Sequence, residues 1–190
     1  MDTAPRQPVR TVDELVAFIA RCDGVFDSLG PDGDPIDILE HGLQCAYILV
    51  QRYPEDVELH VAGLVHDLGH VVAPDEPTAP VAHGEIGAGF VRDLLGDRVA
   101  RLTALHVPAK RYLVATDLAY GNRLSGGSTL SLVMQGGAMT PEEVADFEAD
   151  PDARDAANLR RADEAAKVIG RVVPNLETWI PALEAVAAGR

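Results

Sequence analysis

The chain has 190 residues, of which 47% are hydrophobic and 24% charged, and this length and composition suit one globular domain with a substantial core. Its net charge of -14 argues against nucleic-acid binding as the main role, whereas a small anionic substrate would need a local cationic pocket. Two cysteines are too few for a disulfide framework, and no window approaches the roughly 18 apolar residues of a membrane span. The start has no apolar run typical of a signal peptide, so we expect a cytoplasmic protein.

The first elements are a flexible arm and an amphipathic helix. Residues 1–10 are expected to form the arm. A helix over 12–28 follows, and it begins with a capping box in which Thr11 is the N-cap and Glu14 lies three residues later. Glycine, proline and aspartate residues then predict a loop over 29–36.

Apolar residues spaced by three and four predict helices along the rest of the chain. Thr140 before Pro141, with acidic residues behind it, is a strong helix start. These helices are expected at 38–53, 55–70, 83–95, 97 to about Pro108, 141–148, 151–168 and 175–188. No segment shows the alternation of a strand and no domain boundary is visible, so the sequence predicts a single all-α domain over 1–190.

Histidines are the sharpest chemical feature of the sequence, and they are His41, His60, His66, His70, His83 and His106. Four of them fall inside apolar helical segments far apart in the chain. Burying several imidazoles is costly unless each has a partner, and one metal ion can satisfy several at once. The adjacent pair His66 and Asp67 adds a carboxylate, which can bridge two metals while the imidazole binds one. The pattern predicts a metal site between core helices.

Five blocks of the chain follow one another in a characteristic order: HGLQ (41–44), VHDLGH (65–70), HGEIGA (83–88), ALHVPAKRYL (104–113) and LRRADEAAK (159–167). Together they resemble the HD-domain superfamily, and within it the two-metal members. The chain is most similar to the HD-domain mixed-valent di-iron oxygenases that degrade phosphonates, and more distantly to myo-inositol oxygenase. The resemblance covers about residues 35–170 and implies an HD-domain helical bundle with its metal-binding core there.

The resemblance also implies the ligands of two iron ions, Fe(II) and Fe(III), with dioxygen as co-substrate. His41, His66 and Asp163 would hold one iron, His83 and His106 the other, and Asp67 would bridge them. Imidazole and carboxylate ligands suit iron. A single-metal HD hydrolase needs neither His83 nor His106, so their presence favours two metals.

Cationic and hydroxyl side chains are the next candidates, because they suit a phosphonate or phosphate. Lys110 lies four residues after His106, although a helix break at Pro108 would weaken that link, and Arg160 lies three before Asp163. Both could instead be solvated surface charges. In the similar oxygenases loop hydroxyls bind the phosphonate, and Ser128 and Ser131 have the matching spacing, with helix capping as their alternative role.

Three further polar residues are candidates for lining a substrate pocket. His70 follows His66 by one helical turn, and Gln44 follows His41 by three residues. Asp34 stands about where the aminohydroxyethylphosphonate oxygenases carry a glutamate that receives the substrate amine. Pro31 stands about where they carry a tyrosine that can occupy an iron. These departures put recognition of an amine in doubt, so a hydroxyphosphonate with a quaternary amine or none is an alternative.

The leading hypothesis is an oxygenase that uses dioxygen to cleave the carbon–phosphorus bond of a 1-hydroxyalkylphosphonate, giving phosphate and a carboxylate. In it Asp67 acts as the bridging ligand, and Lys110 acts at the reacting phosphonate. The alternative is a metal-dependent HD phosphohydrolase that acts on a nucleotide or small phosphate ester, because the fold hosts both chemistries. A regulatory HD module is the third reading. The predicted partner is a small-molecule organophosphonate substrate, with no nucleic acid or membrane, and the protein is expected to be a monomer or homodimer.

Overall fold

The computed structural model describes residues 7–26, 33–73 and 79–189, and this part of the chain is helical with no strand. The all-α prediction is therefore confirmed. Residues 1–6 of the expected arm, Pro31 with the rest of 27–32, and residues 74–78 lie outside the described residues. The helices are α1 (Val12–Ala20), α2 (Ile38–Arg52), α3 (Val57–Val65), α4 (Gly69–Val72), α5 (Ala79–Thr116), α6 (Leu118–Gly121), α7 (Gly126–Met134), α8 (Pro141–Glu148), α9 (Ala153–Ala165), η1 (Leu176–Trp179) and α10 (Ile180–Ala188).

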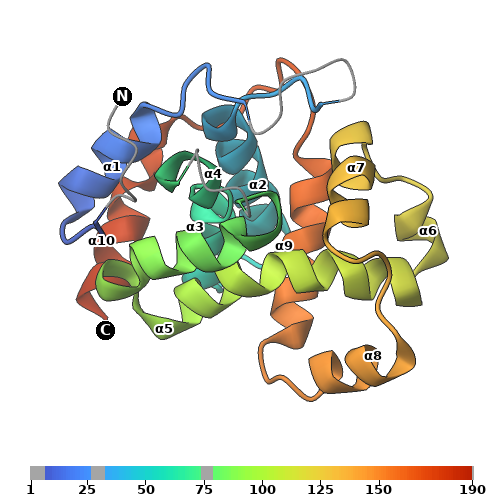
Figure 1. The fold of residues 1–190 in the computed structure, drawn as a ribbon. Coiled ribbons are helices and arrows are strands. Elements are labelled where there is room, and N and C mark those ends of the chain that lie inside the picture. The colour runs from blue at the N-terminus through green and yellow to red at the C-terminus, as the bar shows by residue number, and fades with distance from the viewer. Residues whose placement is uncertain (1–6, 27–32, 74–78, 190) are drawn as a thin grey trace.

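The centre of the molecule is formed by α2, α3, α5 and α9, which pack directly on one another (Figure 1). Their facing sides supply most of the buried apolar side chains, including Leu49, Val65, Leu102 and Leu159. Helices α1 and α10 lie together on one side of this centre, and α6, α7 and α8 lie on the other (Figure 1). His41, His66, His83 and His106 are buried within this central region.

Local sequence signals explain how several helices begin. The capping box at Thr11 and Glu14 is present at α1, and an equivalent box with Thr140 and Glu143 starts α8, as the sequence predicts. Helix α1 ends at Ala20 rather than at residue 28, because the chain turns through Gly24, which has a positive φ of 69°. The prediction of a helix over 12–28 is wrong in its second half.

Residues 7–10 of the expected arm are docked on the domain. Val9 is buried, and its backbone N–H donates to the Phe90 carbonyl at 3.1 Å. Arg10 pairs with Asp93 at 2.7 Å. Both partners belong to α5, so the beginning of the described chain is held against that helix.

Helix α5 is two helical arms joined at Gly96, whose φ of 83° is outside the helical range. The break there agrees with the separate helices predicted on either side, but the end near Pro108 is wrong, because the second arm continues to Thr116. A proline inside a helix removes one hydrogen bond and costs about 3 kcal/mol. Complete burial of Ala109 and Leu113 beyond it offsets that cost.

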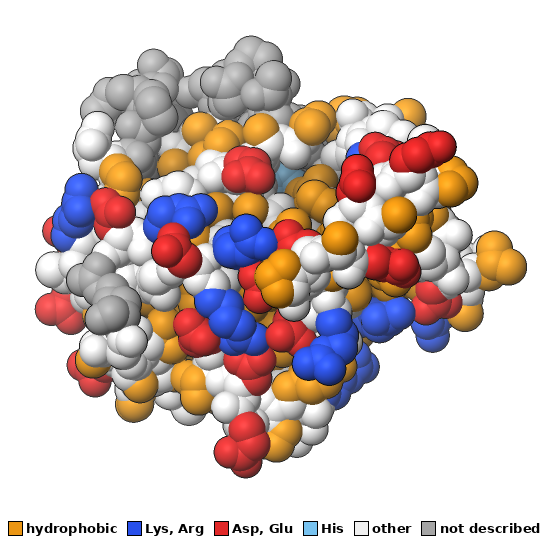
Figure 2. Space-filling model, turned by 90° about the horizontal axis from the view of Figure 1, so that it is seen from below, with side chains coloured by type: hydrophobic (Ala, Val, Ile, Leu, Met, Phe, Trp, Pro, Cys, Tyr) orange, Lys and Arg blue, Asp and Glu red, His pale blue; other side chains and the backbone are white. Residues whose placement is uncertain are grey.

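The surface is strongly charged but mixed in sign. On the face seen in Figure 2, basic and acidic side chains lie interspersed. Arg98 illustrates the pattern, since it pairs with Asp56 at 2.7 Å and Asp155 at 3.0 Å. Among the described helices, none is long and apolar enough to span a membrane.

Candidate metal centre and substrate pocket

Six buried or nearly buried ligand side chains meet in the interior, and they come from four parts of the fold. His41 lies on α2, His66 and Asp67 directly follow α3, His83 and His106 lie on the two arms of α5, and Asp163 lies on α9. They form two groups, within each of which the ligand atoms are no more than 4.8 Å apart: His41, His66 and Asp163, and Asp67, His83 and His106. This is the division that the family resemblance implies for two metals.

Asp67 stands between the two groups and faces both with different oxygens. Its Oδ2 lies 3.4 Å from Nε2 of His41 and 3.4 Å from Nε2 of His66. Its Oδ1 lies 3.6 Å from Nε2 of His83 and 3.5 Å from Nε2 of His106. A carboxylate with this placement can bind one cation through each oxygen.

Helix α3 ends immediately before His66 and Asp67, and this end lets both residues face the centre. The expected continuous helix over 55–70 is wrong, because α3 ends at Val65 and α4 begins at Gly69. Adjacent side chains on a continuous helix point about 100° apart. The turn between α3 and α4 lets His66 and Asp67 enter the same space instead. The backbone at Gly69 also lies very close to α5, since a Cβ there would be 1.9 Å from the His83 carbonyl oxygen.

Backbone carbonyls fix the orientation of three of the imidazoles. Nδ1 of His41 lies 3.1 Å from the Ala166 carbonyl, that of His66 2.9 Å from the Gly63 carbonyl, and that of His106 2.6 Å from the Thr103 carbonyl. An Nδ1–H that donates to a carbonyl leaves Nε2 with its lone pair, the form that binds a metal. Nε2 of His66 is buried and has no hydrogen-bond partner among the described residues. These side chains therefore fit a bound metal ion.

The charge of the site also favours cations. Burial by itself would raise the pKa of Asp163, but the Arg160 guanidinium and His41 hold it well below its usual range. Burial lowers the pKa of His66 to about 4, so that imidazole is neutral. Burial would also lower the pKa of His41, yet its contacts with Asp163 and Asp67 raise it to about 10. Two charged carboxylates thus share a buried space in which a metal would displace the His41 proton.

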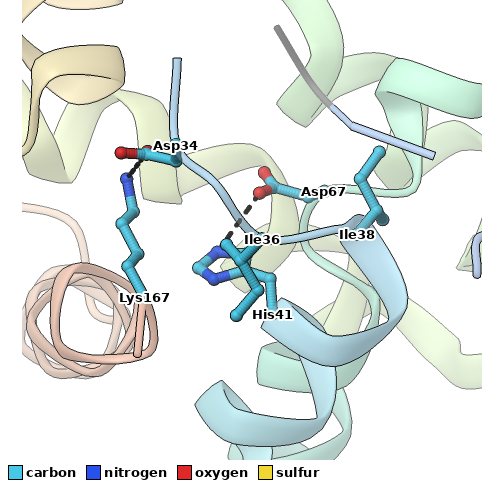
Figure 3. A pocket seen from close by; sticks show the side chains of 6 residues that line it. All are labelled: Asp34, Ile36, Ile38, His41, Asp67 and Lys167. Atoms are coloured by element: carbon cyan, nitrogen blue, oxygen red, sulfur yellow. Dashed lines mark hydrogen bonds and ion pairs between the residues drawn. The ribbon is translucent and has the colours of Figure 1, made fainter. Parts of the chain in front are cut away.

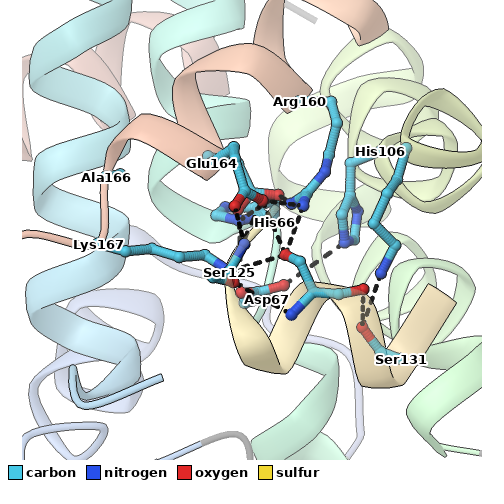
Figure 4. Close-up of polar contacts among 12 residues, drawn as sticks. His66, Asp67, His106, Ser125, Ser131, Arg160, Glu164, Ala166 and Lys167 are labelled. Atoms are coloured by element: carbon cyan, nitrogen blue, oxygen red, sulfur yellow. Dashed lines mark hydrogen bonds and ion pairs between the residues drawn. The ribbon is translucent and has the colours of Figure 1, made fainter. Parts of the chain in front are cut away.

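Arg160 links this centre to a second layer of polar residues. Its guanidinium contacts Asp163, and its Nη2 donates to Ser128 Oγ at 2.7 Å and to Glu164 at 2.6 Å (Figure 4). Its Nε donates to the Tyr120 hydroxyl at 2.7 Å. Arg160 is 4% exposed, so it is not a solvated surface charge.

Lys110 is buried beside the same centre. Because α5 continues through Pro108, Lys110 stays one helical turn from His106, and its Nζ donates to Ser131 Oγ at 2.7 Å. Burial, together with the positive charge of Arg160, lowers the pKa of Lys110 to about 7. The ammonium is therefore close to losing its proton at neutral pH.

The two serines on α7 face the cations rather than cap the helix. Ser125 is the N-cap, and its Oγ accepts from the Ser128 N–H at 3.1 Å. Ser128 and Ser131 lie within α7, and Ser131 Oγ donates to the Gly127 carbonyl at 2.9 Å. The alternative role of helix capping does not apply to either of them.

Sequence reasoning overlooked Lys167, which follows α9 and contacts Asp34, Ser125 and Ser128. Asp34 is buried and forms an ion pair with it at a pocket that also contains Ile36, Ile38, His41 and Asp67 (Figure 3). A signal for Lys167 was present, because the chain has only two lysines and the other is Lys110.

The other predicted residues occupy different places around the centre. Gln44 is buried and donates to the Val168 carbonyl at 2.7 Å, so its amide holds the segment whose Ala166 carbonyl meets His41. The His70 ring stacks on His83 with a centroid distance of 4.0 Å. His60 lies away from the centre, with Nε2 2.8 Å from the Tyr53 carbonyl.

Comparison with known proteins places this chain in a family. The HD domain family model matches residues 38–146, and the chain belongs to the HD-domain family. The chain is 36% identical over 179 residues to a [1-hydroxy-2-(trimethylamino)ethyl]phosphonate dioxygenase (glycine-betaine-forming) of Leisingera caerulea, covering 90% of this chain and 89% of that protein. It is 40% identical over 147 residues to a hydroxymethylphosphonate dioxygenase of Gimesia maris, covering 74% and 73%. An uncharacterized protein, L432, of Acanthamoeba polyphaga mimivirus is 30% identical over 180 residues, covering 88% and 81%. The resemblance to the HD-domain phosphonate oxygenases is confirmed.

Proposed function

We propose that this protein is a mixed-valent di-iron oxygenase that cleaves the carbon–phosphorus bond of a 1-hydroxyalkylphosphonate with dioxygen, releasing phosphate and a carboxylate. The observation that carries the proposal is the position of Asp67, whose two oxygens face two separate groups of ligands beside buried cations and hydroxyls. The names of two relatives, both phosphonate dioxygenases, support the same reaction.

The reaction balances without another oxidant. Both atoms of dioxygen end in the products, one in the carboxylate and one in phosphate, and one proton is released for each substrate consumed. The bond that breaks joins the hydroxyl-bearing carbon to phosphorus. Two iron ions would supply the redox chemistry with dioxygen. One would be held by His41, His66 and Asp163 and the other by His83 and His106, with Asp67 between them.

The chain's own contribution is to bind and orient the phosphonate. Arg160 and Lys110 already contact Ser128 and Ser131, so two cations and two hydroxyls converge on one side of the ligand groups. Charge-assisted hydrogen bonds from such groups would fix the phosphonate oxygens and so position the neighbouring carbon–hydrogen bond. A bound phosphonate dianion would also favour the protonated form of Lys110, whose pKa is otherwise lowered to about 7.

Metal analysis of anaerobically purified protein, combined with low-temperature EPR spectroscopy, tests the proposal. We expect about two irons per chain, the number that two separate ligand groups can hold, and a coupled mixed-valent signal after partial oxidation. Manganese, cobalt or nickel with no mixed-valent signal after iron reconstitution would contradict the oxygenase. That result, with turnover of phosphate esters, would support the phosphohydrolase alternative. When a ligand histidine is replaced by alanine in the same metal analysis, His60→Ala is the matched control, because it removes a buried imidazole that lies away from the centre.

A further inference from the structure

The ammonium of Lys167 is fully satisfied by the protein itself. Its Nζ contacts the Asp34 carboxylate and donates to Ser125 Oγ at 3.0 Å and to Ser128 Oγ at 2.9 Å. A lysine ammonium has three N–H donors, so each has an acceptor within the chain. The Lys167 side chain is 13% exposed and that of Asp34 is 9% exposed, so the pair is largely withdrawn from water. Lys167 therefore has no remaining N–H with which to bind a substrate directly.

Asp34 is held in this pairing by a second contact and by the backbone of α7. Ser125 Oγ donates to Asp34 Oδ2 at 3.1 Å. The chain approaches so closely that a Cβ on Gly127 would lie 2.8 Å from the same oxygen. The charge of Asp34 is thus neutralised by an internal cation at the edge of the metal centre, and the carboxylate has little room to turn away.

The pocket beside this pair has an apolar wall. Ile36 and Ile38 line it together with Asp34, Lys167 and the ligands His41 and Asp67 (Figure 3). No Phe, Tyr or Trp is among the described residues that line it, so it lacks the aromatic cage that commonly binds quaternary ammonium groups. A substituent on the substrate carbon would therefore meet branched aliphatic side chains and an ion pair that is already complete.

We propose that Lys167 is a specificity-determining residue. Its ammonium pairs with Asp34, the one carboxylate outside the metal centre among the described residues that line this pocket, so the enzyme selects 1-hydroxyalkylphosphonates whose substituent is uncharged over those with a cationic amine. The inference rests on the proposed function and narrows its substrate class. A cationic substituent would have to displace Lys167 from Asp34 or lie beside a second positive charge in a largely dry pocket, and both are unfavourable.

Two probes of nearly equal shape test the proposal, namely 1-hydroxypropylphosphonate and 2-amino-1-hydroxyethylphosphonate. They differ in a terminal methyl group against an ammonium group. We expect the wild-type holoenzyme to favour the uncharged probe in kcat/KM. The Lys167→Met variant should shift the ratio toward the cationic probe by about tenfold or more, because the freed Asp34 carboxylate can then form a charge contact with the amine. The Lys167→Met, Asp34→Asn double variant should lose that gain, because the Asp34 carboxylate that lines the pocket can no longer receive the amine.

Further variants keep the test decisive. Asp34→Asn alone leaves the Lys167 ammonium in place, with Glu164 Oε2 still 3.9 Å from it, and removes the carboxylate that could receive an amine. The kcat/KM of this variant for the cationic probe should therefore not rise relative to that for the uncharged probe. Arg92→Met is the matched control, since it removes a cation from an exposed pair with Asp97 and should leave the ratio unchanged. A wild-type preference for the cationic probe, or a ratio in Lys167→Met within about twofold of the wild type, would overturn the proposal.

Binding separates this inference from the proposed function. Dissociation constants of the two probes on the iron-loaded protein, measured by calorimetry without dioxygen, should show the same shift in Lys167→Met. If the binding ratio shifts but neither probe is oxidised when dioxygen is added, the proposed reaction fails and the role of Lys167 stands. If both probes are oxidised and neither ratio shifts, the role of Lys167 fails and the reaction stands.

Discussion

Replacement of Arg160 by methionine should destabilise the protein severely, because Arg160 is the counterion of two buried carboxylates. The side chains of Asp163 and Glu164 are 3% and 9% exposed, and the guanidinium contacts both. It also donates to Ser128 and Tyr120. Methionine keeps much of the volume of the arginine but provides no donor and no charge, so these acceptors lose a partner together.

The expected magnitude follows from the burial of the pair. Removing one partner of a buried ion pair typically costs about 3–5 kcal/mol, because the charge left behind is uncompensated. Whole domains are stable by roughly 5–15 kcal/mol, so this is a large fraction of the total. The effect must also depend on pH. The pKa of Asp163 is held well below its usual range, so its contribution is present at neutral pH and is lost as the pH falls through the folded-state value. The difference between wild type and variant should therefore narrow on acidification.

Urea unfolding at neutral and acidic pH, in the presence of a chelator for both proteins, measures this difference. Arg161→Met is the matched control, because the contact of the neighbouring Arg161 with Asp117 is long, at 3.5 Å, and we expect no measurable change from it. The prediction is wrong if the free energy of unfolding of Arg160→Met is less than about 1 kcal/mol below that of the wild type, or if the difference does not depend on pH, because loss of one partner of a buried ion pair should produce both effects.

Three more predictions follow from the centre and its surroundings. The kcat/KM for a hydroxyphosphonate should fall as the pH rises through about 7, because Lys110 loses its proton there. In a pH profile of Lys110→Met this fall should be absent, and kcat/KM below pH 7 should be roughly 10–100-fold lower than in the wild type. Elemental analysis of His106→Ala should find roughly half the iron of the wild type, because one ligand group loses an imidazole while the other is intact. An unchanged iron content would contradict the division of the ligands into two groups. Gly69→Ala should lower the free energy of unfolding by about 1–3 kcal/mol or more, because its Cβ would clash with the His83 carbonyl, and a melting temperature equal to that of the wild type would contradict the close approach.

The sequence was sufficient for the helical class and for the set of candidate ligands. Polar residues such as His41, His83 and Asp163 stand out because they interrupt apolar helical patterns, and a buried imidazole needs a partner. Their order along the chain also matches a family pattern. Start signals such as Thr11 and Thr140 were readable because capping depends only on residues three positions apart.

Other features depend on packing that no local pattern encodes. Pro108 is a helix breaker by its own chemistry, and only the burial of the residues after it keeps α5 continuous. The turn at His66 and Asp67 interrupts a stretch with helical periodicity throughout. The ion pair of Asp34 with Lys167 joins positions 133 residues apart, so it depends on how the segment before α2 and the segment after α9 meet in three dimensions.

We propose that the centre performs an oxidation and not a hydrolysis. The most direct test follows dioxygen consumption and phosphate release together, in the iron-loaded protein supplied with 1-hydroxypropylphosphonate or hydroxymethylphosphonate. We predict that one dioxygen disappears for each phosphate released, with a carboxylate as the second product. Phosphate release from phosphate esters without dioxygen uptake, and no reaction with either phosphonate, would contradict an oxidative role for the centre.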